Sequence, residues 1–342
     1  MRKGWTYKPW SEVLTIINGK NQKAVESKNG EFPIYGSGGI MGYASEWLCP
    51  EDCVIVGRKG NINKPIFVTS KFWNVDTAFG LNANKNRLRP RFLFYFCKNY
   101  NFELLNKAVT IPSLTKVDLL KILMPVPGLI DQDSIVSELD KINELIALKK
   151  SQLRDIDALS QSIFYEMFGD PITNEKGWEV KKVIDVVKLQ RGFDLPVQNR
   201  LTYGNIPIYG SNGIVGFHTV SKASYGIITG RSGSIGEVFM SDKPFWPLNT
   251  SLFSVDCHGN NILYLKFLIQ SYHLERFKQG AGVPTLNRNS FHSNDIIDVP
   301  VSLQQSFANK IEAIEEQKFR INQSLKDLET LLQSRMDYWF ND

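Results

Sequence analysis

Two short stretches of the chain combine glycine with cationic side chains in a pattern that can bind anions. They read VIVGRKGNI at 54–62 and IITGRSGSI at 227–235. Glycine lets a backbone approach a ligand closely, and cationic side chains can neutralise phosphates or donate to the edge of guanine. A plain β-turn with solvated cations is the alternative, but the arginine recurs in both copies, which favours binding. The candidate contact residues are Arg58, Lys59, Arg231 and Ser232.

A second pair of glycine-rich stretches adds hydroxyl, amide and phenol groups. PIYGSGGIMGY at 33–43 and PIYGSNGIVGF at 207–217 are identical at eight of eleven positions. Their polar side chains sit in flexible glycine surroundings, where they could contact a ligand. A tight turn required by the fold, with its tyrosine packed, explains the repeat equally well. The candidate residues are Tyr35, Ser37, Tyr209, Ser211 and Asn212.

A third pair of segments shares a proline and a leucine but differs in its other side chains. IPSLT at 111–115 answers to VPTLN at 283–287. Different side chains on a shared frame are what two sites with different ligands require, although drift in a surface loop would look the same. The candidate residues here are Thr115, Lys116, Asn287 and Arg288.

These motifs belong to a tandem duplication of one domain-sized unit, because their neighbours recur at a spacing of roughly 172 residues. Each half of the 342-residue chain is about the size of one ordinary domain. The other matching segments are RKGW at 2–5 with EKGW at 175–178, WNVDT at 73–77 with WPLNT at 246–250, and IFYEMFGD at 163–170 with RMDYWFND at 335–342.

Composition predicts well-cored globular domains, with 42% hydrophobic, 12% aromatic and 22% charged residues. A formal charge of +5 and a pI near 8.8 lean only mildly towards a polyanionic partner. The four cysteines are too few for a disulfide framework and lack a zinc-site pattern, so we expect them reduced and buried. Without a signal peptide or a membrane-spanning run, we expect a cytoplasmic protein.

The sequence argues against catalysis by this chain. All four histidines lie in the second half, so a histidine-based triad or metal site cannot belong to both copies. No Walker loop, dinucleotide fingerprint or Asn/Asp-Pro-Pro-aromatic methyltransfer motif occurs. We therefore expect no metal and no catalytic residues, and we assign any chemistry to another chain.

Each unit changes character once, from a module of short β-runs to a long helix. In residues 1–129 strands such as CVIVG alternate with turns, and a helix is expected over 91–105. Residues 130–169 contain no proline or glycine until Gly169 and carry a heptad seam. The pattern repeats as a module over 170–301 and a helix over 302–342. The fold class predicted is α+β, with two modules joined by an antiparallel two-helix coiled coil.

The seam of the first helix runs from Ile135 to Met167, and that of the second runs from Phe307 to Trp339. Such stripes must be buried, and the other copy is the expected partner; docking of each helix on its own module alone is the alternative. Recurring Trp73 and Trp246 are expected in the core. The aromatic residues at the helix ends could cap the coiled coil or dock a partner, and these are Phe164, Phe168, Trp339 and Phe340.

The order of these motifs resembles the DNA specificity subunit of Type I restriction-modification systems, over essentially the whole chain. The resemblance implies two target-recognition domains, each reading half of a split, asymmetric duplex target, with the helix pair as a ruler. It also implies two docked methyltransferase subunits that hold S-adenosylmethionine and methylate adenine, and that can be joined by translocating restriction subunits. A coiled-coil scaffold with two heads that bind protein or glycan ligands is the alternative.

Overall fold

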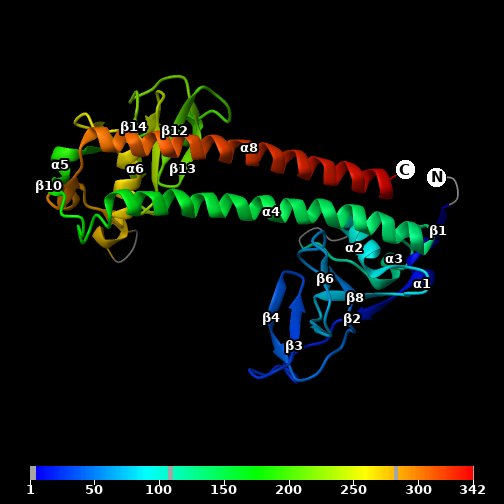
Figure 1. Ribbon diagram of the computed structural model, residues 1–342. Coiled ribbons are helices and arrows are strands. Elements are labelled where there is room, and N and C mark those ends of the chain that lie inside the picture. Colours follow the sequence, from blue (N-terminus) through cyan, green and yellow to red (C-terminus); the bar gives the residue numbers. More distant parts are fainter. Residues whose placement is uncertain (1–4, 107–110, 281–283, 342) are drawn as a thin grey trace. The chain divides into compact units, whose positions relative to one another are not determined.

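The computed structural model describes residues 5–106, 111–280 and 284–341, so residues 2–4, 283 and 342 of the repeated motifs lie outside it. The chain forms two compact units. Unit 1 comprises Met1–Lys150 and Asn322–Asp342, and unit 2 comprises Ser151–Ile321. Each unit contains one α+β module and parts of both long helices, α4 (Leu129–Phe168) and α8 (Val301–Phe340) (Figure 1). The compact units therefore differ from the sequence repeats, because each takes helix from both halves of the chain.

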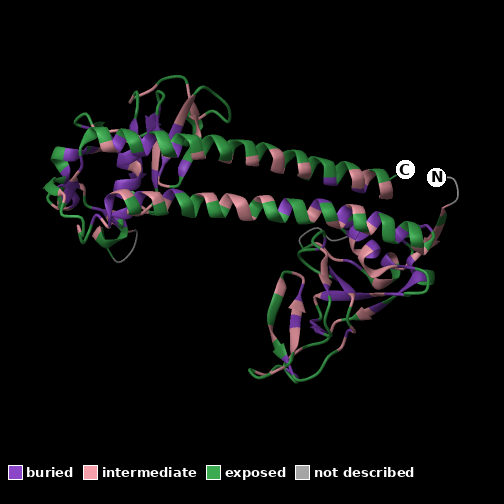
Figure 2. Cartoon of the chain, viewed as in Figure 1, coloured by how far each residue is buried: buried purple, intermediate pink, exposed green. Residues whose placement is uncertain are grey.

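The module of unit 1 is built on a four-stranded antiparallel sheet in the order β2-β8-β5-β6, with a three-stranded sheet β4-β3-β7 and a two-stranded pair β1-β9. Figure 2 shows that buried residues concentrate in the larger sheet and where α4 meets α2, whereas β4 is mostly intermediate or exposed. The strands are β1 (Thr6–Pro9), β2 (Leu14–Asn18), β3 (Phe32–Gly36), β4 (Gly39–Ala44), β5 (Cys53–Gly57), β6 (Ile66–Val68), β7 (Trp73–Asn74), β8 (Ala78–Ala83) and β9 (Leu123–Val126). The helices are α1 (Trp10–Val13), α2 (Pro90–Asn99) and α3 (Lys116–Leu119), with a 3-10 turn at Phe102–Leu105.

Unit 2 repeats this topology, with sheets β11-β17-β14-β15 and β13-β12-β16 and the pair β10-β20, and adds the short pair β18-β19. The matching strand order confirms the duplication and the α+β class. The strands are β10 (Glu179–Lys182), β11 (Lys188–Arg191), β12 (Ile206–Gly210), β13 (Gly213–His218), β14 (Gly226–Gly230), β15 (Val238–Ser241), β16 (Trp246–Pro247), β17 (Ser251–Asp256), β18 (Lys278–Gln279), β19 (Thr285–Leu286) and β20 (Asp295–Asp298). The helices are α5 (Val183–Val186), α6 (Ile262–Ser271) and α7 (Arg288–His292), with 3-10 turns at Val197–Asn199 and Leu274–Phe277.

Local sequence accounts for the main elements of the modules. All five residues of β5 are buried, which explains its unbroken apolar run. Helix α2 begins with Pro90, whose missing N–H is harmless at the first helical position. The single helix expected over 91–105 is wrong at its end, because the chain leaves α2 at Tyr100 in an extended conformation before the 3-10 turn. All four cysteines are free and buried, as expected, and so are Trp73 and Trp246.

The long helices pair antiparallel within each unit. In unit 1, Glu138 of α4 binds Arg335 of α8, and Lys150 lies 2.9 Å from Glu329. Residue numbers thus rise along α4 as they fall along α8, so the two helices are antiparallel. Leu332 and Met336 of α8 complete the core that the first part of α4 forms with its module. The helices therefore pair with each other and also dock on a module. The two arrangements that the heptad seams allowed occur together.

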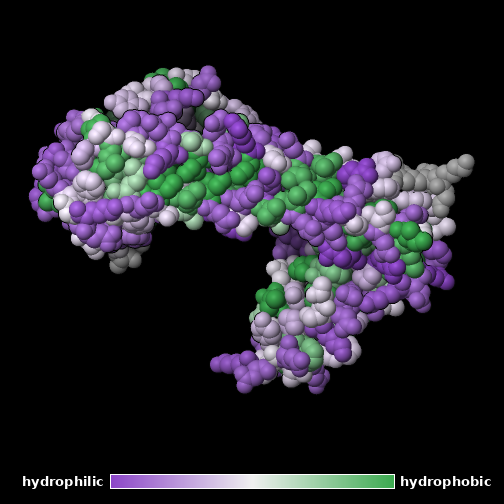
Figure 3. All heavy atoms as spheres, viewed as in Figure 1, coloured by the Kyte–Doolittle hydropathy of each residue, from purple (hydrophilic) through white to green (hydrophobic). Residues whose placement is uncertain are grey.

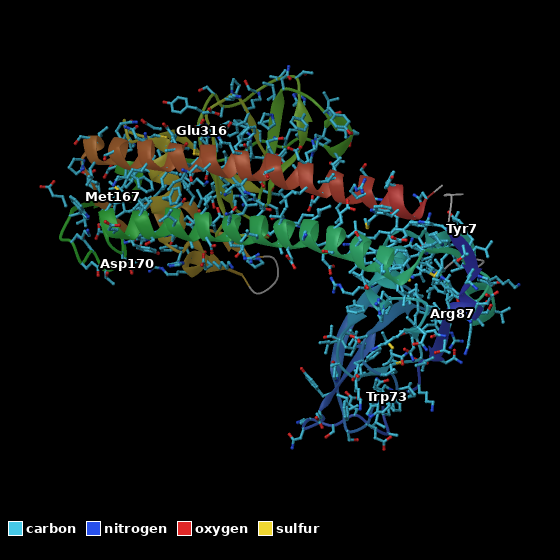
Figure 4. The ribbon with its side chains drawn as sticks, turned by 45° about the vertical axis from the view of Figure 1, so that its right-hand side comes forward. Tyr7, Trp73, Arg87, Met167, Asp170 and Glu316 are labelled. Carbon is cyan, nitrogen blue, oxygen red and sulfur yellow. The ribbon has the colours of Figure 1, made fainter. Side chains whose placement is uncertain are left out.

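In unit 2 the second part of α4 meets the first part of α8 in the same sense. The seam residue Lys318 binds Asp157 at 2.5 Å. Phe164 and Phe168 are fully buried against Phe307, with ring centroids 5.7 and 5.3 Å from it. The seam residue Met167 is only partly buried, on the face of α4 turned towards α8 (Figure 4). The heptad count therefore missed the most buried face of this helix end, which packs on the module as well as on Phe307 of the other helix.

A buried glutamine attaches the start of each long helix to its module. In unit 1, Oε1 of Gln132 accepts the N–H of Arg89 at 2.7 Å, and its Nε2 donates to the carbonyls of Arg87 and Pro127 at 2.9 Å. In unit 2, Gln304 accepts the N–H of Asn261 at 2.9 Å. Its Nε2 donates to Oδ1 of Asn260 at 2.7 Å and to the carbonyl of Val299 at 2.8 Å. The clamp is duplicated with the fold. None of the described helices is long and apolar enough to cross a membrane.

We predict that Gln132→Leu destabilises unit 1 by about 1–3 kcal/mol, because it leaves buried backbone groups without their partner at similar side-chain volume. The melting temperature of the variant should fall, and the amide of Arg89 should exchange faster with deuterium. Gln317→Leu, at an exposed position of α8, is the control and should change neither. Unchanged melting and exchange in Gln132→Leu would show that the clamp does not stabilise the helix junction.

Candidate functional site

The repeated motifs of unit 1 meet at the end of strand β5. The loop that follows this strand donates from the N–H of Arg58 to the carbonyl of Thr77 at 2.8 Å. The N–H of Leu114 donates to the carbonyl of Arg58 at 2.9 Å, and the N–H of Gly60 donates to the carbonyl of Pro112 at 3.1 Å. Backbone hydrogen bonds thus join the loop at 57–62 to the segments 73–77 and 111–115. The three segments are far apart in the sequence and form one surface.

Unit 2 repeats this junction bond for bond. The N–H of Arg231 donates to the carbonyl of Thr250 at 2.9 Å, and the N–H of Leu286 donates to the carbonyl of Arg231 at 2.8 Å. The N–H of Gly233 donates to the carbonyl of Pro284 at 3.1 Å. Because these bonds use only the backbone, the frame is independent of the side chains it presents. We call this loop cluster the candidate site of each unit.

The glycine turn that joins β3 to β4 in unit 1, and β12 to β13 in unit 2, completes each cluster. A Cβ on Gly57 would lie 3.1 Å from Cβ of Ser37, and a Cβ on Gly230 would lie 3.3 Å from Cβ of Ser211. The turn therefore rests directly on the cationic loop. Ser211 also donates to Oδ1 of Asn212 at 3.2 Å.

Two glycines are required for this close approach. A Cβ on Gly57 would lie 2.3 Å from the carbonyl oxygen of Asn61, and one on Gly230 would lie 1.7 Å from that of Ser234. Both obstacles are backbone atoms, so a side chain cannot be accommodated without moving the loop. The recurrence of glycine here thus has a structural cause.

The rings of the candidate tyrosines pack inside each module, next to the glycine turn. Tyr35 packs edge-on against Phe72 with ring centroids 5.6 Å apart, and Tyr209 packs in the same way against Phe245 at 5.6 Å. Burial raises the pKa of both phenols, so each stays neutral. The parallel pairing of β3 with β7 adds a bond from the N–H of Val75 to the carbonyl of Tyr35 at 2.9 Å. The packing role weighed for these tyrosines is what the geometry supports.

Each arginine is oriented by a backbone carbonyl. Arg58 is exposed, and its Nη1 lies 3.4 Å from the carbonyl oxygen of Asp76. Nε of Arg231 donates to the carbonyl of Asn249 at 2.8 Å. A guanidinium has five N–H donors, so one such bond leaves donors for a ligand. Beside them, Lys59 bridges to Ser113 and Ser232 bridges to Thr285 through the backbone.

The segments that end at Thr115 and Asn287 contain helix caps, which the sequence did not predict. Thr115 caps helix α3 by accepting the N–H of Asp118, and Asn287 caps α7 by accepting two N–H groups. Threonine and asparagine both serve as N-caps, so their exchange keeps one function rather than indicating two ligands. Lys116 donates to the carbonyl of Ile16 at 2.7 Å, and Nε of Arg288 lies 3.4 Å from Oδ1 of Asn289.

The aromatic residues at the helix ends divide by burial. Phe164 and Phe168 are fully buried in unit 2, so a docking partner cannot reach them and they close the helix end. In unit 1, Trp339 stacks on Trp5 at 6.0 Å and donates to Glu138 at 3.1 Å, and Phe340 packs edge-on against Phe92 at 5.2 Å. Both remain partly exposed.

Two features of the site escaped the sequence reading. The carbonyls that contact the arginines belong to the segments at 73–77 and 246–250, for which the sequence predicts only buried tryptophans. The hairpins also carry exposed aliphatic side chains after their turns, where a polar turn is the ordinary choice. Their recurrence in both copies was the available signal. Among residues 5–106, 111–280 and 284–341 the structure contains no group of three His, Cys, Asp or Glu side chains that could hold a metal.

The buried histidine of unit 2 acts within the fold. Nε2 of His292 accepts the N–H of Leu189 at 3.0 Å, which requires the neutral ring. Burial, with Arg288 and Lys188 nearby, lowers its pKa. His292 therefore supports strand β11 through a neutral ring.

Comparison with known proteins gives a consistent result over the whole chain. The family model for the type I restriction modification DNA specificity domain matches residues 2–158 and 175–330. The putative type I restriction enzyme specificity subunit S.HindORF215P of Haemophilus influenzae is 24% identical, over 97% of this chain and 93% of that protein. The type I restriction enzyme MjaIX specificity subunit of Methanocaldococcus jannaschii is 25% identical over 46% of this chain and 39% of that protein.

Solved structures share the fold. The crystal structure of a type I restriction-modification system S subunit from M. genitalium superposes with a TM-score of 0.63 at 17% identity, covering 99% of this chain and 96% of that one. A chain from a study of complex assembly and conformational transition in the type I R-M system gives 0.64 at 15% identity, covering 98% and 97%. Both solved structures therefore share the fold of this chain over nearly its whole length.

We predict that Gly57→Ala disrupts the loop cluster of unit 1, at a cost of about 1–3 kcal/mol, because its Cβ overlaps a backbone carbonyl. The amide of Leu114, which bonds to this loop, should exchange faster. Gly38→Ala in the neighbouring turn is the matched control, since its Cβ would meet only the side-chain Nδ2 of Asn61, at 3.7 Å. Equal behaviour of the two variants would show that the close approach is not what holds the site.

Proposed function

The chain belongs to the type I restriction modification DNA specificity family, and from this premise we infer that each of its loop clusters binds one half of a split, asymmetric DNA target. One observation carries the proposal. The same three backbone-bonded segments occur in both units, each presenting an arginine whose guanidinium contacts a backbone carbonyl. A guanidinium reads O6 and N7 of guanine in the major groove or binds phosphate.

Loops that share a backbone arrangement but carry different side chains suit two modules that recognise different half-sites. Backbone bonds fix the loops, while neighbouring positions differ between the units, as in the change from Lys59 to Ser232 and from Gly38 to Asn212. Phosphate contacts would position each cluster, and side chains at these positions would select bases. The scaffold with ligand-binding heads that do not touch DNA is not favoured by the family match.

The partners follow from the same premise. We expect two methyltransferase subunits to assemble with this chain, to hold S-adenosylmethionine in their own pockets and to methylate adenine in each half-site. Translocating restriction subunits would join that complex. In this arrangement the chain supplies sequence recognition, and its own residues perform no chemical step.

We predict that Arg58→Ala weakens binding of the assembled complex to its target by about 1–3 kcal/mol and relaxes specificity in one half-site only. Arg231→Ala should do the same in the other half-site. Arg87→Ala removes an equal charge from an exposed position of unit 1 and is the control (Figure 4). The measurement is fluorescence anisotropy with duplexes that carry single base changes, over a range of salt concentrations.

The outcomes separate three roles for these arginines. A uniform loss over all sequences, with a shallower salt dependence, would indicate phosphate contact instead of base reading. Relaxed specificity in both half-sites for either variant would contradict the assignment of one half-site to one unit. No change relative to Arg87→Ala would make both loops structural turns.

We further propose that the paired helices set the gap between the half-sites. Seven residues inserted after Lys150 in α4 and after Ile321 in α8 keep the heptads in phase. They add about 10 Å at ~1.5 Å per residue, or about three base pairs at ~3.4 Å each. Methylation mapping should show a correspondingly longer gap. Insertion in one helix only should destabilise the protein. A doubly lengthened protein that folds, assembles and still modifies only the original spacing would contradict the ruler.

A further inference from the structure

Both modules expose two consecutive aliphatic side chains directly after the glycine turn. Ile40 and Met41 are 56% and 61% exposed, and Ile214 and Val215 are 53% and 42% exposed. A single exposed apolar side chain is ordinary and needs no explanation. Here an adjacent pair recurs at equivalent positions of two modules, and Figure 3 shows hydrophobic residues over the β3–β4 hairpin of unit 1. This recurrence favours a ligand-binding role for the two pairs.

Each pair lies at a β-bulge of its hairpin. In unit 1, Ile34 pairs with Gly42 and Tyr35 pairs with Ile40, so Met41 is the extra residue of β4. The register between β12 and β13 shifts at the same place, between Pro207 and Tyr209, and Val215 falls within that shift. A bulge bends the strand and redirects its side chains, and bulges are frequent beside functional sites.

A glycine on the facing strand makes room for each redirected side chain. A Cβ on Gly36 would lie 2.7 Å from Sδ of Met41, and one on Gly210 would lie 3.2 Å from Cγ1 of Val215. The hairpin thus presents an aliphatic surface of similar form in both modules, although the residues themselves differ. The bulge and the facing glycine are shared, so the exposure is built into the fold.

The aliphatic pair and the arginine loop form one continuous surface. A Cβ on Gly38, two residues before Ile40, would lie 3.7 Å from Nδ2 of Asn61 in the arginine loop. In unit 2, Oγ of Ser211 lies 3.8 Å from where a Cβ on Gly233 would sit, and Ser211 precedes Ile214 by three residues. The turn that carries the aliphatic pair therefore lies against the loop that carries the arginine in each unit.

We propose that the pairs Ile40–Met41 and Ile214–Val215 contact thymine methyl groups in the major groove, each in the half-site of its own unit. The inference rests on the proposed function. An arginine that reads guanine O6 and N7 does so from the major groove, which admits a two-stranded ribbon, and the C5-methyl of thymine is the apolar group on that edge. A half-site that contains a target adenine also contains a thymine opposite it.

The test replaces each thymine of the mapped target by deoxyuridine, which removes only the methyl group. Binding of the complex with its methyltransferase subunits is measured by fluorescence anisotropy. At least one uracil in each half-site should weaken binding about three- to fivefold, as expected for loss of one buried methyl group. The double variant Ile40→Ala with Met41→Ala should weaken binding by a similar or larger factor and should no longer distinguish thymine from uracil in its half-site.

The equivalent change of Ile214 and Val215 should affect only the other half-site. Ile40→Thr keeps the β-branched shape and guards against loss of the hairpin, and it should reduce the thymine preference too. Leu123→Ala in unit 1 and Val180→Ala in unit 2 remove exposed apolar side chains of other strands and should leave the preference unchanged.

Each other outcome overturns the inference. If the thymine preference survives in the double variant, or if uracil never weakens binding by the wild-type complex, these residues do not read the methyl group. If the variants instead lose their methyltransferase subunits in the absence of DNA, the pairs form a protein contact. Specific binding that ignores uracil would leave the proposed function intact, whereas a wild-type complex without sequence preference would overturn both.

Discussion

The apolar stripe of each long helix has to be covered, and the arrangement of the chain follows from how this is done. A lone amphipathic helix of this length cannot hide its stripe from water. Each unit covers it twice, with the other helix and with an α+β module. In unit 1, Leu332 and Met336 of α8 share a core with Leu139 of α4 and the module. In unit 2, Phe164 and Phe168 of α4 share a core with the second module. Neither sequence repeat is therefore complete as a folding unit, since the core of each module includes helix from the other half of the chain.

Polar contacts select one arrangement from the many that apolar stripes allow. Heptad seams can slide past each other by whole turns with little loss of burial, whereas the buried amides of Gln132 and Gln304 fit only one junction with the module. The ion pairs Glu138–Arg335 and Asp157–Lys318 lie at positions where the seam is not apolar. Partly exposed pairs near the surface add about 0–1 kcal/mol, so their main effect is on register. A fixed register is what the proposed spacer between the two half-sites needs.

The candidate sites separate support from recognition. Backbone hydrogen bonds and two obligatory glycines hold the loops, and Tyr35 and Tyr209 pack beneath them. Side chains at the surface are then free to differ without disturbing the frame. The cap residues Thr115 and Asn287 show that difference alone is not evidence of recognition, because both satisfy helix N–H groups. The positions with no such duty include Lys59 and Ser232, and the aliphatic pairs of the hairpins.

The sequence predicts the duplication, the α+β modules, the long helices and the buried cysteines and tryptophans, because repeats, heptad periodicity and breaks at proline and glycine are local signals. It also placed arginine in two matched loops. The full burial of Phe164 and Phe168 rather than Ile163 and Met167 depends on tertiary packing, because heptad periodicity predicts one seam but not the second face that a helix end presents to a module. Only the tertiary structure brought the loop at 57–62 to the segments 73–77 and 111–115, because those contacts are backbone bonds between distant residues and leave no pattern in side-chain type. The bulge that exposes Met41 is likewise set by the pairing of two strands and not by either strand alone.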